Sequence, residues 1–363
     1  MTLLFTVILV ALVFEYINGF HDTANSIATV VSTKVLTPRQ AVILAASTNL
    51  IGAMWGTAVA KTISSGLVDA KLVNLTSGII ICALLGAIIW NLITWWFGLP
   101  SSSSHALIGG LCGSALAASG NNWHVIIWAQ PDKIHWWLGK GLLWKVIVPM
   151  VTSPLAGLVL GFLFMGFLYF LLHNARPHAV NRFFGRAQML SAGAMGFMHG
   201  TNDAQKTMGI IALTLFAATK AGQLDQLPAW LSFLRIPEPA PGKDMDIRLW
   251  IKVVCALTMA SGTWVGGWRI IKTLGHKMVK LHPINGFAAE ASSATVIWVA
   301  THLGIPVSTT HNISAAIMGV GAARRLNAIK WTVVERMVWA WILTIPVTAT
   351  LAYLFVRLLR VFS

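Results

Sequence analysis

The sequence predicts an all-α polytopic membrane protein made of two inverted-topology repeats with interrupted helices or helical hairpins. Three observations carry this prediction. First, 56% of the 363 residues are hydrophobic and only 10% are charged, whereas soluble domains contain about 25% charged residues. Second, apolar runs long enough to cross a membrane recur along the whole chain. Third, two distinct polar motifs each occur twice, in the same order.

The formal net charge is +15, which in a soluble protein would indicate a nucleic-acid partner. Here Lys and Arg gather in short loops, where they orient membrane helices according to the positive-inside rule. We therefore expect a multi-pass membrane protein, in contact with lipids and not with nucleic acid. Three cysteines lie in apolar segments without metal-binding spacing, so neither a disulfide framework nor a metal site is expected: Cys82, Cys112 and Cys255.

Four apolar spans are expected in the first half of the chain. The first covers residues 3–17, runs into a polar motif at 18–27 and ends near Lys34 and Arg39. The others are expected at 41–60, 75–97 and 143–172. The third span ends in Trp-Trp-Phe at 95–97, which is typical of an interfacial aromatic belt. Gly98 and Pro100 follow directly, and both residue types interrupt helices, so we expect a broken helix here. The polar, tryptophan-rich segment at 119–142 is expected at the membrane surface.

The second half begins with a basic cytoplasmic linker, expected as a loop at 176–188, before an apolar segment at 189–219. A long loop at 220–248 contains four prolines and is expected to be an extracytoplasmic insertion. Further apolar segments are expected at 249–267, 286–302 and 331–357. The sequence leaves open whether 286–322 forms a re-entrant hairpin or two full spans.

An aspartate motif occurs twice, as NGFHDTANSI at 18–27 and as HGTNDAQKTM at 199–208. Aligning the glycines of the two copies stacks Asp22 on Asp203, His21 on Asn202, and Asn25 on Lys206. A charged residue at the bilayer centre costs about 2.5–3.5 kcal/mol or more. A chain that repeats a carboxylate in the same setting is expected to use it, although a helix cap or a buried ion pair is the structural alternative.

A hydroxyl-rich motif, GLPSSSSHALIGG at 98–110, returns as GIPVSTTHNISAA at 304–316. The alignment pairs Pro100 with Pro306, Ser102 with Ser308, Ser103 with Thr309, Ser104 with Thr310, and His105 with His311. The chain therefore divides into two repeats, residues 1–175 and 189–363. Each repeat carries an aspartate motif and then a Pro-Ser/Thr-His motif.

Charge predicts how the two repeats face. Basic loops at 269–280 and 324–330 bracket the hydroxyl motif of the second repeat. The matching window at 63–74 holds only one lysine and one aspartate, and that at 118–124 has no Lys or Arg. The positive-inside rule then puts the flanks of the two motifs on opposite sides of the membrane. Inverted repeats with broken helices are a signature of transporters, whose sites lie near the membrane midplane.

The motifs also indicate what is bound. Broken helices expose N–H groups that favour anions and carbonyl groups that favour cations. A cluster of Ser and Thr hydroxyls after such a break suits a tetrahedral oxyanion. The two aspartates would repel the anion on their own, so they are expected to bind a co-transported cation or to carry protons. This combination describes a cation-coupled oxyanion symporter.

Three rival functions remain open. A different oxyanion, above all sulfate, would suit the same hydroxyls. A membrane hydrolase using Ser and His is disfavoured because the chain has no G-x-S-x-G motif, and we expect no enzyme activity. A channel is also possible in principle, although channels rarely place paired buried carboxylates beside such hydroxyls.

These motifs resemble the inorganic phosphate transporter (PiT) family. The resemblance rests on G-F-H-D-T-A-N, on G-T-N-D-A-Q-K, on both P-x-S-x-x-H segments and on the stretch WRIIKTLGHKMVKLHPINGFAAE at 268–290. It covers nearly the whole chain and implies phosphate uptake by an inverted-repeat, homodimeric carrier. It implies an ion site lined by Asp22, Asn25, Asn202 and Asp203. It implies phosphate ligands at Ser102, Ser103, Ser104, Ser308, Thr309 and Thr310.

Two positions depart from the sodium-coupled pattern, which has Asn-Asp and a later Asn in both copies. His21 replaces the first Asn, and Lys206 replaces the later Asn of the second copy. Sodium prefers oxygen ligands, whereas a Lys ammonium offers only donors. We hypothesise that Lys206 occupies a cation position as a fixed counter-charge to Asp203, and that His21 joins the coupling site.

This departure favours protons over sodium as the coupling ion and resembles the bacterial low-affinity branch, which is thought to carry metal-phosphate with a proton. The resemblance implies a location in the bacterial inner membrane. Sodium coupling and a sulfate permease of the same fold remain the alternatives. No resident cofactor is expected. A divalent metal would enter only as cargo bound to phosphate.

Three further polar residues are expected to gate the site or to orient its ligands. His105 and His311 follow the hydroxyls and serve either as proton sites or as orienting groups. Glu290 lies in an apolar run and has no acidic counterpart at the matching position, Leu84. Glu15 also lacks an acidic counterpart, and the sequence leaves its role open.

Overall fold

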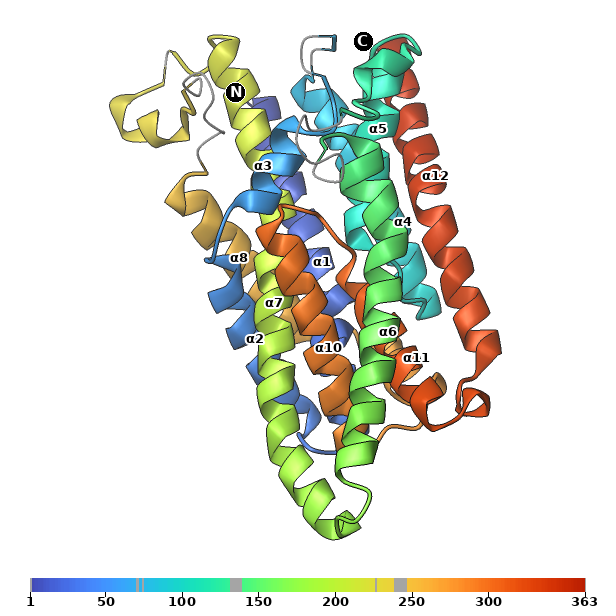
Figure 1. Cartoon of the computed structure of the whole chain (residues 1–363). Helices are drawn as coiled ribbons and strands as arrows, with labels where there is room; N and C mark the ends of the chain where they lie inside the picture. Colours follow the sequence, from blue (N-terminus) through green and yellow to red (C-terminus); the bar gives the residue numbers. More distant parts are fainter. Residues whose placement is uncertain are drawn as a thin grey trace.

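The computed structural model describes residues 2–69, 72–73, 75–130, 139–225, 227–237 and 247–362. Within these residues the chain is helical, and its β-structure is limited to two isolated bridges. The principal helices are α1 (Thr2–Ser32), α2 (Pro38–Ala53), α3 (Ala58–Ser65), α4 (Ser77–Phe97), α5 (Ser103–Ala118), α6 (Val148–Leu171), α7 (Pro177–Lys220), α8 (Leu249–Val265), α9 (Trp268–Lys272), α10 (Pro283–His302), α11 (Thr309–Arg324) and α12 (Trp331–Phe362). The all-α prediction is confirmed (Figure 1).

Short helical segments join or extend these helices. Two π-helical turns, η3 (Leu143–Ile147) and η5 (Thr273–Lys277), continue into α6 and out of α9. Short 3-10 segments are η1 (Trp123–Val125), η4 (Ala229–Leu234) and η6 (Leu326–Ala328). Residues 226 and 238–246 of the long loop expected at 220–248 lie outside the described residues, as do residues 131–138 of the surface segment expected at 119–142.

Four of the described helices are long and apolar enough to cross a membrane: α1, α4, the combined η3–α6 segment and α12. Two bent pairs bring the number to six if each pair is one span. The span expected at 41–60 is such a pair, because α2 and α3 meet at 70°. Gly56 lies at this bend with φ of +78°, a backbone conformation that favours glycine.

One predicted boundary is confirmed and one needs correction. The first span runs through the aspartate motif as expected, and α1 ends at Ser32. The motif contains no proline, and its side chains are buried. The basic loop expected at 176–188 is helical, because α7 starts at Pro177, a residue that suits the first helical turn.

The helix breaks in the two hydroxyl motifs are confirmed. Gly98 and Gly304 both adopt left-handed backbone conformations, with φ of +65° and +61°. The chain is then extended until α5 and α11 begin, and these helices pack back against α4 and α10. Each has 16 residues, or about 24 Å, which is shorter than the bilayer core of about 30 Å. Helices α4–α5 and α10–α11 therefore form two helical hairpins whose second arms are too short to cross the core alone.

Helices from the two expected repeats interleave. Helix α1 packs on α8, α2 packs on α7, α5 packs on α12, and α11 packs on α6. Matching glycines allow the last two contacts. A Cβ atom on Gly113 would lie 2.0 Å from the carbonyl oxygen of Ala349, and one on Gly319 would lie 2.0 Å from that of Leu158. The local packing thus recurs in both halves, while their inverted orientation stays a prediction.

Figure 1 gives the direction of the two hairpins. Helix α5 lies toward the end of the molecule that holds both chain termini, and α11 lies in the opposite half. The turn between α6 and α7 marks that opposite end. The tips of the two hairpins lie between these ends, beside the middle of α1 and α7. The two hydroxyl motifs are at these tips, and the two aspartate motifs are in α1 and α7.

Candidate functional site

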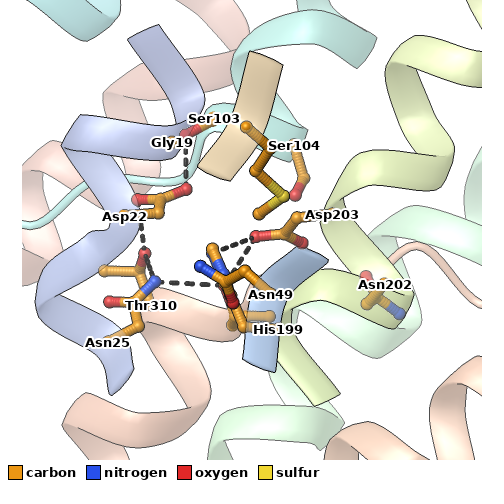
Figure 2. Close-up of polar contacts among 12 residues, drawn as sticks. Gly19, Asp22, Asn25, Asn49, Ser103, Ser104, His199, Asn202, Asp203 and Thr310 are labelled. Carbon is orange, nitrogen blue, oxygen red and sulfur yellow. Dashed lines mark hydrogen bonds and ion pairs between the residues drawn. The ribbon is translucent and has the colours of Figure 1, made fainter. Parts of the chain in front are cut away.

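A buried polar cluster lies where α1 and α7 cross the N-terminal ends of α5 and α11 (Figure 2). We call it the central cluster. Its members come from both aspartate motifs and both hydroxyl motifs. They are Asp22, Asn25, Ser103, Ser104, His199, Asp203, Lys206, Thr309 and Thr310, and each is at most 3% exposed.

Asp22 holds one side of the central cluster. Its Oδ2 accepts a hydrogen bond from the hydroxyl of Ser103, at 2.5 Å. Its Oδ1 accepts one from the hydroxyl of Thr310, at 3.1 Å. His21 Nδ1 lies 2.8 Å from the same Oδ1. One carboxylate therefore binds a hydroxyl from each of the two hairpins.

Asp203 holds the other side. Its Oδ1 forms an ion pair with the Lys206 ammonium, one helical turn away. Its Oδ2 accepts a hydrogen bond from Thr309, at 2.9 Å, and lies 3.0 Å from His199 Nε2. Lys206 also donates to the hydroxyl of Ser104. The predicted ion pair between Lys206 and Asp203 is therefore formed, and it reaches the hydroxyls of both hairpins.

Asn25 links the two sides. Its Nδ2 donates to Thr309 Oγ1 at 3.1 Å and to Thr310 Oγ1 at 2.9 Å. Its buried Oδ1 has no hydrogen-bond partner within the described residues. An acceptor atom is thus available beside the hydroxyls and the aspartates.

Asp22, His199 and Asp203 each place one ligand atom within 4.8 Å of the others. A single cation could therefore contact all three residues. Sequence reasoning assigned no role to His199, although this residue opens the second aspartate motif. Its Nδ1 lies 3.1 Å from Asn49 Oδ1, and Asn49 in turn donates to Thr263 at 3.1 Å. These contacts fix the imidazole so that Nε2 faces Asp203.

His21 faces the tip of the α4–α5 hairpin. Its Nε2 lies 3.1 Å from Thr94 Oγ1 and 3.5 Å from Ser101 Oγ. The Ser101 hydroxyl donates to Thr94 at 2.8 Å. His21 thus connects Asp22 to this hairpin instead of facing the second aspartate.

Ser102 and Ser308 have a different role from the hydroxyls that follow them. Each is the N-cap of its helix, and its side-chain oxygen accepts from the backbone N–H of His105 or His311, at 3.2 Å in both copies. Such caps satisfy a helix-terminal donor and are favoured at this position. Their hydroxyls therefore hold the helix starts in place. Of the residues that follow, Ser103, Thr309 and Thr310 donate to the aspartates, and Ser104 accepts from Lys206.

Asn202 lies apart from the aspartates, as Figure 2 shows. Its Nδ2 donates to Thr301 Oγ1 at 2.9 Å and to the carbonyl oxygen of Ile305 at 3.2 Å. The structure therefore places Asn202 against the tip of the α10–α11 hairpin and does not bring it into the central cluster.

His105 and His311 meet behind the hydroxyls. Their ring centroids are 4.9 Å apart, in an edge-to-face arrangement. The ring of His311 also stacks on Trp341, with centroids 4.2 Å apart. Both ring nitrogens of His311 are buried and have no hydrogen-bond partner among the described residues. This contact joins the first turns of α5 and α11, which supports an orienting role.

Glu290 lies outside the central cluster. Its carboxylate accepts hydrogen bonds from Thr29 on α1 and from Ser191 on α7, and from Gln188 at 3.4 Å. Thr29 is seven residues from Asp22, or about 10 Å along α1. The residue therefore joins α10 to α1 and α7 at a second buried place. Glu15, whose role was left open, accepts from Thr207 on α7.

Comparison with known proteins shows which proteins this chain is similar to. The model of the phosphate transporter family matches residues 18–352 of the chain. A probable low-affinity inorganic phosphate transporter of Bacillus subtilis is 42% identical over 345 residues, which cover 95% of this chain and 93% of the relative. The protein of the same description from Rhizobium meliloti is 44% identical and covers 97% and 95%.

A solved structure of a sodium-dependent phosphate transporter is also similar to this chain. It superposes with a TM-score of 0.80, is 24% identical, and covers all of both chains. At this identity the likeness supports the fold alone. It confirms the all-helical architecture that the sequence predicts.

Proposed function

The chain belongs to the phosphate transporter family, and from this premise we propose that it imports inorganic phosphate as a proton-coupled symporter by alternating access. It is a transporter and not an enzyme, and it is a multi-pass protein of the bacterial cell membrane, as the sequence predicted. The coupling ion, the transport cycle and the homodimer expected from the sequence are parts of this proposal.

The observation that carries the proposal is the bonding of hydroxyls to carboxylates. Ser103 and Thr310 donate to Asp22, and Thr309 donates to Asp203. A hydroxyl that donates to a carboxylate cannot give the same hydrogen to phosphate. When a proton or another cation becomes the partner of the carboxylate, the hydroxyl is released to donate to the oxyanion. Cation binding and phosphate binding then depend on each other.

Lys206 supports protons as the coupling ion. Its ammonium already contacts Oδ1 of Asp203 and so supplies a positive charge at one of the two carboxylate oxygens. The ammonium also donates to Ser104 and to the carbonyl oxygen of Val307, at 3.2 Å. It can therefore supply a positive charge to phosphate without a second ion, which leaves Asp22 as the carboxylate that takes up a proton.

A second candidate is transport of phosphate together with a divalent metal. The carboxylates of Asp22 and Asp203 and the imidazole of His199 lie within ligand distance of one another. Carboxylate and imidazole together suit a divalent transition metal better than sodium, which prefers oxygen ligands. In this version the metal is cargo and reaches the cluster bound to phosphate.

Uptake of labelled phosphate into proteoliposomes tests the proposal. An inward proton gradient in sodium-free buffer is expected to drive uptake, and an inward sodium gradient at equal pH on both sides is not. Uptake with sodium alone would retain phosphate transport and reject proton coupling. Movement of sulfate without phosphate would show that the hydroxyl motifs bind a different oxyanion. Adding a divalent metal at fixed pH distinguishes the second candidate, since uptake of the metal would accompany that of phosphate.

A further inference from the structure

A basic pocket lies beside the tip of the α10–α11 hairpin, outside the central cluster. It has a volume of about 480 Å³. We call it the outer basic pocket. Its lining comes from α3, from the segment before η3 and from the hairpin tip. The lining residues that matter for its charge and contacts are Lys61, Thr62, Lys140, Lys145, His302 and Leu303.

The charge of this pocket is one-sided. Lys61, Lys140 and Lys145 line it, and none of the described residues in its lining is acidic. Lys61 has a further interaction partner, so the positive charge available to an anion comes from Lys140 and Lys145. Lys140 and His302 are exposed, and Lys61 and Lys145 are half-buried. Like charges near a low-dielectric wall repel each other more strongly than they do in water. A multivalent anion in the pocket would relieve this repulsion.

The pocket is connected to the central cluster by the hairpin tip itself. Lys145 Nζ donates to the carbonyl oxygen of Leu303 at 3.0 Å, and Thr62 donates to that of Gly304 at 2.7 Å. Four residues after Leu303, the carbonyl oxygen of Val307 accepts a hydrogen bond from Lys206. Four residues span at most about 14 Å. The backbone from Leu303 to Val307 therefore contacts Lys145 of the pocket at one end and Lys206 of the central cluster at the other.

The pocket also lies in the half of the molecule that phosphate would enter. Figure 1 places α3 toward the end that holds both chain termini, opposite the α6–α7 turn. The basic loops used to predict the cytoplasmic side follow α8 and α11, at the other end. The outer basic pocket thus faces the extracytoplasmic half in the predicted orientation.

We propose that the outer basic pocket is an entry site that binds inorganic phosphate before the anion reaches the central cluster. This inference rests on the proposed function and adds a second anion site to it. The lysines attract the oxyanion and raise its local concentration, as clefts of one charge sign do for charged substrates. When the Lys145 ammonium turns to the bound anion, it releases the carbonyl oxygen of Leu303, and one fastening of the hairpin tip is lost.

Kinetics of phosphate uptake by bacterial cells that lack other phosphate transporters test this proposal. Lys140→Gln and Lys145→Gln are expected to raise the KM about three- to tenfold each, with Vmax within about twofold of wild type, since local charge acts mainly on capture. Raising the ionic strength should weaken phosphate uptake by wild type more than uptake by the double variant, which carries both Lys140→Gln and Lys145→Gln. Lys220→Gln is the matched control, because Lys220 is exposed at the same end but does not line the pocket.

The outcomes separate this inference from the proposed function. If wild type takes up phosphate and both lysine variants keep its KM, the entry site does not exist. Should Lys145→Gln fail to fold, Lys145→Arg, which keeps the charge, and the exposed Lys140→Gln still decide the question. Equilibrium binding of labelled phosphate to the purified protein needs no transport. It should give two classes of site in wild type and one in the double variant, and an equal number in both would overturn the proposal.

Discussion

The ammonium of Lys206 lies against the carboxylate of Asp203 one turn away on α7, and both side chains are almost completely buried. Removing one partner of a buried ion pair leaves an uncompensated charge, whereas replacing both partners by neutral groups is often tolerated. The pair therefore offers a way to separate what the two residues do for stability from what they do for transport.

Asp203→Asn is expected to destabilise the protein by about 3–5 kcal/mol, because it leaves the Lys206 ammonium buried without its counter-charge. The double variant Asp203→Asn, Lys206→Met should regain most of this loss. Thermal unfolding in detergent measures both effects. Phosphate uptake should be abolished in the single and in the double variant. Recovery of uptake together with stability would show that Asp203 serves the fold alone.

Lys206 is also expected to determine which cation is coupled to phosphate uptake. Lys206→Asn restores the residue type of the sodium-coupled pattern and opens one side of Asp203 to a cation. We expect phosphate uptake by this variant to acquire a dependence on sodium and to lose part of its response to a proton gradient. Uptake into proteoliposomes under each gradient provides the measurement. If uptake stays fully independent of sodium and is otherwise normal, Lys206 has no such role.

Much of this site was predictable from local sequence. The helix breaks at Gly98 and Gly304 follow from a glycine, a proline and a helix-capping serine that lie within five residues of one another. These residues act on the backbone locally, so their effect does not depend on the rest of the fold. The pairing of each aspartate motif with a hydroxyl motif followed from their repeated order. Ser103 contacts Asp22 and Thr309 contacts Asp203, each within one expected repeat, whereas Thr310 of the second repeat also contacts Asp22 of the first.

The remaining features depend on rotation about a helix and on tertiary packing. Successive residues of a helix point about 100° apart, so Asp203 faces the central cluster while its neighbour Asn202 contacts the hairpin tip. His199, four residues before Asp203, shares the face of that aspartate. The sequence alone does not show which of these side chains face the central cluster, because their directions depend on the helix running through the motif without a break. The charges at 176–188 likewise suit a loop or the exposed start of a helix equally well.

The close packing of α5 on α12 leads to a prediction about the stability of the protein. Gly113→Ala would place a Cβ atom 2.6 Å from the backbone carbon of Ala349 on α12, so α5 and α12 must separate. Overpacking of this kind costs about 1–3 kcal/mol. Gly166→Ala is the control, because a Cβ atom there meets nothing within 4 Å, and alanine favours helix by about 1 kcal/mol. Thermal unfolding in detergent should show a lower Tm for the first variant and an equal or higher Tm for the second.

The two hairpin tips are fastened in the same way at opposite ends of the site. Thr62 donates to the carbonyl oxygen of Gly304 at 2.7 Å, and Thr273 donates to that of Gly98 at 2.8 Å. Each threonine belongs to one expected repeat and each glycine to the other. Alternating access requires that one end of the site opens while the other stays closed. The hydrogen bond of Thr62 is therefore the candidate that keeps the outer end closed, and that of Thr273 the candidate that keeps the inner end closed.

Thr62→Val and Thr273→Val keep the side-chain shape and remove one hydrogen bond each, worth about 0.5–1.5 kcal/mol. Thr62→Val should favour the outward-open state and Thr273→Val the inward-open state, each by about two- to tenfold. Ser103→Cys, added to each variant, reports the shift through labelling by a membrane-impermeant thiol reagent applied outside cells. The native cysteines are buried, which keeps the background low. Labelling should rise in the first variant and fall in the second. Changes in the same direction in both would mean that the two bonds do not fasten opposite ends of the transport path.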